Sequence, residues 1–132
     1  MFEQVKDYKS ACAVLAKKPI DKRRKLDEHI VLHIMLSTIT EAINFIANGN
    51  KPWIPVYQQN KPIETWYSWW YIDWDKIEKG SYAGLFTLSS NAGLGYASAS
   101  VGNHLQFINR DAAEYAAKTF KPLYMKYIFG ID

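Results

Sequence analysis

The chain has 132 residues, of which 48% are apolar and 22% charged, and its formal net charge is +3. These values fit one ordinary globular domain; they exclude a disordered chain, and the mild charge does not compel binding to nucleic acid. The single cysteine, Cys12, cannot form an internal disulfide, so we expect synthesis in a reducing compartment such as the cytoplasm.

The first predicted element is a short amphipathic helix over about residues 3 to 16. Its apolar residues recur at spacings of three and four, and a proline follows that ends it: Val5, Tyr8, Cys12, Leu15 and then Pro19.

A long central helix is predicted next, with Asp21 as its N-cap and Gly49 of "ANGN" as its C-terminal cap. Its apolar residues cover more than one face, which is typical of a buried helix. The prolines of "KPWIPVYQQNKP" then forbid regular helix, so we expect a structured loop with Trp53 as its anchor.

The next part of the chain is rich in β-branched and aromatic residues. The segments "TWYSWWYI", "GLFTLSS", "GYASAS" and "HLQFI", separated by glycine and asparagine turns, predict an antiparallel sheet of three or four strands. Asn109 then caps one final helix, "RDAAEYAAKTFKPLYMKYIF". The prediction is therefore a single α+β domain over residues 1–132, with two N-terminal helices, this sheet and a C-terminal helix.

The stretch "ETWYSWWYIDW", residues 64–74, holds four of the five tryptophans. On a strand, alternate side chains face opposite ways, so Trp66, Trp70 and Trp74 share one face. We assign this larger set to the core. The second set, joined by the loop tryptophan, forms the candidate partner-binding group, called here the aromatic patch: Trp53, Tyr67, Trp69 and Tyr71. The alternative is that all of these aromatics are core.

No catalytic or cofactor motif is evident. His29 and His33 have the i, i+4 spacing of zinc proteases, but Ile30 stands where those enzymes need glutamate, and His104 is the only other histidine. "GLGYAS" lacks the helix N-terminus that would bind a phosphate, and no GxSxG surrounds any serine. We therefore predict a protein that is not an enzyme, with no cofactor and no bound metal.

A basic segment, residues 17–25, supports an alternative. It could hold phosphates beside exposed aromatic rings that stack on bases, as in single-strand binders. The opposing interpretation is a solvated turn. The candidate nucleic-acid contacts are Lys17, Lys18, Lys22, Arg23, Arg24 and Lys25.

The sequence also gives an expectation about membranes. The longest apolar run, "IVLHIML", falls far short of the roughly 20 residues that span a bilayer. The N-terminus "MFEQVKDYKS" lacks the apolar stretch of a signal peptide. We expect a soluble chain without membrane contact.

Three segments together carry a resemblance: "VGNHLQFINRDAAEYAAKTFKPLY", "TWYSWWYID" and "IMLSTITEAINFIANGNKPWIP". They resemble small uncharacterised proteins encoded by phages and prophages of Bacteroides-type gut bacteria. Ser68, His104 and Ala117 depart from the proline, arginine and glycine of those proteins, and Asn109 replaces a serine while keeping the capping function.

The resemblance implies a phage origin, with synthesis in the host cytoplasm and possible incorporation into the virion. It implies no substrate and no catalytic residue. We therefore expect a non-enzymatic phage protein that acts through protein–protein contacts, either as a virion accessory or decoration component or as a small host-directed factor. Its partner would be a phage protein, a host protein or a second copy of the chain. The alternative is a small nucleic-acid-binding module that uses the basic segment and exposed aromatics.

Overall fold

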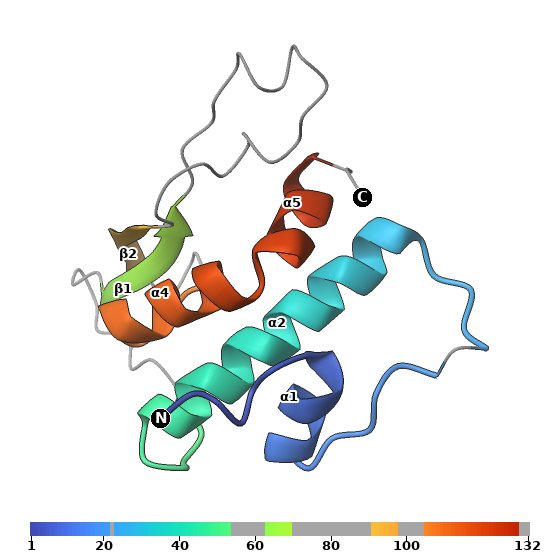
Figure 1. Cartoon of the computed structure of the whole chain (residues 1–132), viewed down its shortest axis with the longest axis horizontal. Helices are drawn as coiled ribbons and strands as arrows, with labels where there is room; N and C mark the ends of the chain where they lie inside the picture. The colour runs from blue at the N-terminus through green and yellow to red at the C-terminus, as the bar shows by residue number, and fades with distance from the viewer. Residues whose placement is uncertain (22, 54–62, 70–90, 98–104, 130–132) are drawn as a thin grey trace.

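The computed structural model describes residues 1–21, 23–53, 63–69, 91–97 and 105–129. Four helices occur in these ranges: α1 (Tyr8–Val14), α2 (Glu28–Ala47), α4 (Arg110–Thr119) and α5 (Lys121–Phe129). Two strands, β1 (Ile63–Trp69) and β2 (Asn91–Ala97), pair antiparallel. The elements are stacked, with the two-stranded ribbon on α4, then α2, then α1 (Figure 1).

The predicted α+β class with a three- or four-stranded sheet is wrong. The described part of the chain is a helical fold whose sheet has two strands. Of the expected strand at "HLQFI", one bridge is described: Phe107 N donates to Trp66 O (2.6 Å), and Trp66 N donates to Phe107 O (3.0 Å). The expected strand "GLFTLSS" lies outside the described residues.

Asn44 of α2 explains why the Phe107 segment pairs at one position. Its Nδ2 donates to Gln106 O (3.0 Å), and its Oδ1 accepts from Ile108 N (2.9 Å). In an extended segment, these two backbone groups point away from those of Phe107. The segment therefore lies between β1 and α2, and a helix side chain takes the hydrogen bonds that another strand would have made.

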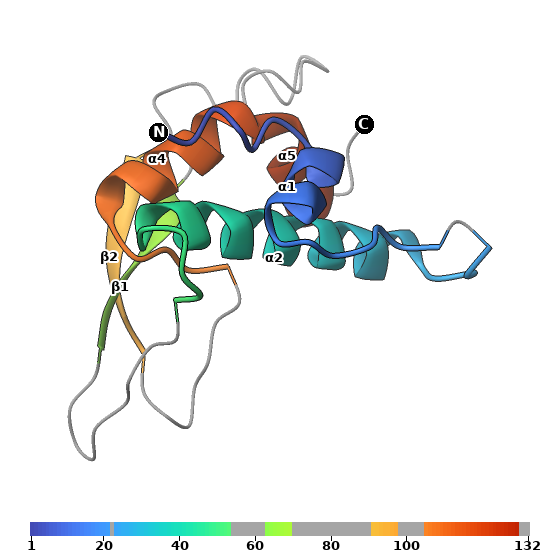
Figure 2. The same ribbon diagram turned by 90° about the horizontal axis from the view of Figure 1, so that it is seen from below.

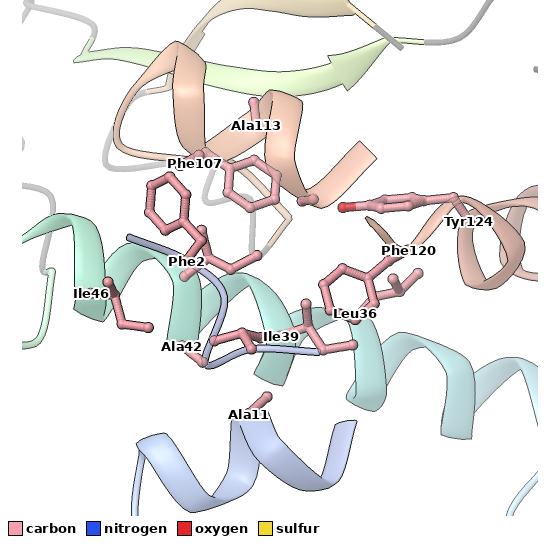
Figure 3. Close-up of a cluster of buried hydrophobic side chains, with 14 residues drawn as sticks. Phe2, Ala11, Leu36, Ile39, Ala42, Ile46, Phe107, Ala113, Phe120 and Tyr124 are labelled. Atoms are coloured by element: carbon pink, nitrogen blue, oxygen red, sulfur yellow. The ribbon is translucent and has the colours of Figure 1, made fainter. Parts of the chain in front are cut away.

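The core lies between α2 and the elements on either side of it (Figure 3). Phe2, Leu36 and Ile39 pack there with alanines of α4 and with Phe107 and Phe120. The small alanine side chains allow α4 to approach its neighbours closely, since the buried residues of α4 are all alanines: Ala112, Ala113, Ala116 and Ala117. At the N-terminal segment, Tyr115 Oη donates to Val5 O (2.9 Å).

The ends of α2 test the helix prediction. Its C-terminal end is confirmed, because Asn48 is the C-cap and Gly49 has the left-handed φ of +72° expected of the residue that follows. Its predicted start is wrong, because Asp27 and not Asp21 is the N-cap. The Asp21 carboxylate instead accepts from Arg23 N (2.9 Å) and pairs with the Arg23 guanidinium, which holds a local turn before the helix.

The single C-terminal helix is also a wrong prediction, because α4 ends at Thr119 and α5 begins at Lys121. Pro122 explains the break. In a continuous helix its ring would clash with the carbonyl of Lys118, and it has no N–H to donate to that carbonyl. In the first turn of a new helix it is tolerated. The predicted Asn109 cap is confirmed, with Oδ1 accepting from Ala112 N (2.8 Å).

Helix α2 is long and apolar enough to cross a membrane by length and composition alone. Half of its most apolar 18-residue stretch is buried inside the fold, where α1, α4 and α5 pack against the helix. A core helix of a soluble protein has the same composition, so this property does not distinguish the two environments.

Candidate functional sites

The aromatic patch lies partly within the described residues. Trp53 follows α2 and is half-buried, and Asn48 Nδ2 fixes the turn before it by donating to Lys51 O and Pro52 O. The backbones of Tyr67 and Trp69 belong to β1, opposite Gly93 and Asn91 of β2. Their side chains, and all of Tyr71, lie outside the described residues.

Trp66 provides the anchor of the ribbon on the helical core. It is half-buried and packs against the core cluster, as predicted for its face of the strand, while its backbone bridges to Phe107. Its neighbours in the predicted core set, Trp70 and Trp74, lie outside the described residues. The register places Leu94 opposite Trp66, with Gly93 and Gly95 on either side of Leu94.

The basic segment 17–25 is partly neutralised by ion pairs. Lys17 Nζ lies 2.7 Å from Glu41 Oε2 of α2, and Arg23 Nη2 lies 2.8 Å from Asp21 Oδ2. The contact with Asp21 raises the pKa of Arg23, and Arg23, through its side chain first and its backbone N–H second, lowers the pKa of Asp21. Lys18, Arg24 and Lys25 are exposed, and Lys22 lies outside the described residues.

The structure does not bring the basic segment and the aromatic strand together. The segment leading into α2 lies at one end of the molecule, and β1 and β2 lie at the other, in both views (Figures 1 and 2). A nucleic acid that contacted both would therefore have to pass along the length of α2.

The two histidines of α2 contact one ring of α5. His29 stacks on Tyr127, with centroids 4.8 Å apart and planes 10° apart, and His33 tilts against the same ring at 5.8 Å. His33 Nδ1 also lies 3.1 Å from Tyr127 Oη. Beside them, Lys126 Nζ lies 2.7 Å from Glu28 Oε1. These contacts give both imidazoles a role in helix packing.

Sequence reasoning missed the residues that complete this cluster. Tyr127 and Lys126 are distant in sequence from the histidines. They are neighbours on α5, and the antiparallel packing of α5 on α2 brings them beside His29 and Glu28. Within the described ranges, no three His, Cys, Asp or Glu side chains gather as a metal site would require. That the protein holds no metal stays a prediction.

Comparisons of the chain with models of protein families, with curated proteins and with solved structures found no match.

Proposed function

We propose that the protein acts through protein–protein contacts and not through catalysis, with the aromatic patch as its contact surface. The observation that supports this proposal is the make-up of the core. Aliphatic, alanine and phenylalanine side chains fill it together with Tyr124, and Trp66 is the tryptophan that packs against it among those whose side chains are described. The helical core is thus built without calling on Trp53, and an aromatic-rich strand beside it fits a partner surface.

The ribbon offers a place for such a surface. Among the described helices, α4 alone packs on β1 and β2. Since strand side chains alternate between faces and Trp66 faces the core, the alternation predicts Tyr67 and Trp69 on the opposite face. We propose, with the resemblance to phage proteins, that the partner is a phage or host protein or a second copy of the chain, met in the host cytoplasm or the virion.

Photo-crosslinking in the natural host tests this proposal. A benzophenone amino acid at Trp69 should crosslink to one defined protein, and the same probe at exposed Lys9 of α1 provides the control. With the partner purified, Trp69→Ala should weaken binding about tenfold or more while the melting temperature is kept. Equal crosslinking from both positions, or unchanged affinity of the variant, would refute the proposal.

The nucleic-acid alternative is less well supported, because two of its six cations are in ion pairs and the aromatic strand lies at the other end of the molecule. A gel shift with single-stranded DNA at low salt, comparing the natural chain with Arg23→Ala plus Arg24→Ala, distinguishes the two functions. Binding that falls steeply with salt and is lost in the variant would favour the alternative.

A further inference from the structure

The contact between α2 and α5 defines two sides of the helix pair. The helices run antiparallel, since the start of α2 meets the end of α5 (Figure 1). His29 and Tyr127 face each other as a stacked pair. Successive residues of a helix are separated by about 100°. In an antiparallel pair, the residues that precede two facing residues therefore lie on one side, and those that follow lie on the other.

The preceding residues confirm this geometry. Glu28 and Lys126 come directly before the stacked pair, and they meet in an ion pair of 2.7 Å. An ion pair therefore occupies this side of the helix pair.

The following residues, Ile30 and Ile128, are exposed at 45% and 48%, and among the described side chains of these two helices they are the large apolar ones that stay exposed. By the same geometry they lie side by side, opposite the ion pair. Half-buried Ile34 and Met125 lie about one turn from Ile30 and Ile128, at the i+4 and i−3 positions that neighbour them on each helix. We call these four residues the isoleucine face.

Cations also lie in the segment that leads into α2, five and six residues before Ile30. Arg24 and Lys25 are exposed in the short segment before the helix, and Asp27 is the carboxylate beside them. Arg23 and Lys126 add positive charge, which Asp21 and Glu28 balance through ion pairs. Among the described residues of this segment, Arg24 and Lys25 thus outnumber the carboxylate of Asp27.

We propose that the isoleucine face binds an amphipathic helix of a partner protein that carries acidic residues. The apolar stripe of that helix would cover Ile30 and Ile128, and its carboxylates would meet Arg24 and Lys25. This surface is separate from the aromatic patch, so the inference goes beyond the proposed function and does not depend on it.

Fluorescence anisotropy of the full chain with a labelled synthetic peptide tests the inference. The peptide is an amphipathic helix of about five turns with a leucine stripe and glutamates elsewhere, and a second peptide has lysines in place of the glutamates. The acidic peptide should bind saturably and more weakly as salt rises, and the basic peptide should bind about tenfold more weakly or not at all.

Two variants separate the apolar and the charged contributions. Ile30→Glu plus Ile128→Glu should reduce affinity for the acidic peptide by about tenfold or more, and Arg24→Glu plus Lys25→Glu should do so without touching any packed residue. The matched controls are exposed Met1→Glu and Lys6→Glu plus Lys9→Glu, which should leave binding unchanged. Equal binding of both peptides, no saturable binding, or equal losses in the control variants would overturn the inference.

A second copy of the chain is the competing occupant. Sedimentation velocity distinguishes it, because a dimer that Ile30→Glu dissociates would show that the isoleucine face covers itself, and this too would overturn the inference.

Discussion

The two halves of α2 have similar apolar sequences and different surroundings. From Leu36 to Ile46 most side chains are buried, and one of them, Asn44, binds backbone on the neighbouring segment. From Glu28 to Ile30 the side chains are exposed, and the contacts with α5 are made by rings and an ion pair. An apolar helix therefore serves as core at one end and as surface at the other, and only its neighbours decide which.

The largest expected effect comes from truncating the buried half. Ile39 is fully buried, so Ile39→Ala should lower the free energy of unfolding by about 2 to 5 kcal/mol, because it removes buried methyl groups and leaves a cavity. Ile30→Ala, at a half-exposed position of the same helix, should cost far less. Urea denaturation of both variants measures the difference. Similar losses would mean that the two halves are equally packed.

Asn44→Ala should lower the free energy of unfolding by about 2 to 4 kcal/mol, because Gln106 O and Ile108 N then lose their partner in the interior. Thr40→Val is the matched control one turn away. Its Oγ1 donates to Leu36 O of the same helix, and that carbonyl keeps a helical partner, so little should change. Equal effects of the two variants would show that Asn44 does not hold the 106–108 segment.

A smaller effect, dependent on pH, is expected at α1. Asp7 accepts from Ser10 N (2.7 Å) as the N-cap, and this bond, then the bond to the Ser10 side chain, lowers the pKa of the carboxyl group. Asp7→Ala should cost about 0.5 to 1 kcal/mol near neutral pH. Because the pKa is lower in the folded state, this stabilisation is present above the unfolded pKa, near 4, and is lost as pH falls through the folded value.

Asp7→Asn is the control for that pH dependence, since asparagine caps a helix without titrating. The stability difference between the Asn and Ala variants should persist at acid pH, while the difference between the natural chain and the Ala variant should shrink. A deficit of Asp7→Ala that stays constant from pH 7 to pH 3 would show that the carboxylate charge does not contribute.

The smallest effect is expected at the exposed end of α2. A double-mutant cycle of Glu28→Gln and Lys126→Met should give a coupling energy of about 0.2 to 1 kcal/mol that falls in high salt, because both side chains are partly exposed. The pair Lys17 and Glu41 provides a second cycle of similar exposure. A coupling well above this range would mean that the α2–α5 contact is shielded from water.

The sequence by itself determined the features that depend on local chemistry. Asn109 caps α4, the Gly49 turn ends α2, and the i, i+4 spacing places His29 and His33 on one face of a helix. Capping and periodicity act within one or two turns, so neighbouring residues suffice to specify them. The prediction was wrong at Asp21 because Asp27 is a second residue able to cap the helix. It was wrong before Pro122 because the proline interrupts a sequence that otherwise favours helix.

Only the tertiary structure decided how the 106–108 segment is paired and what surrounds the two histidines. A strand-like sequence such as "HLQFI" needs partners for its backbone groups, and whether a strand or a side chain such as Asn44 supplies them depends on what the fold brings alongside. In the same way, Tyr127 gives His29 and His33 their role in helix packing, although it lies 94 residues from His33 in the sequence. Contacts over such separations leave no local pattern in the sequence, because they are set by the packing of whole helices.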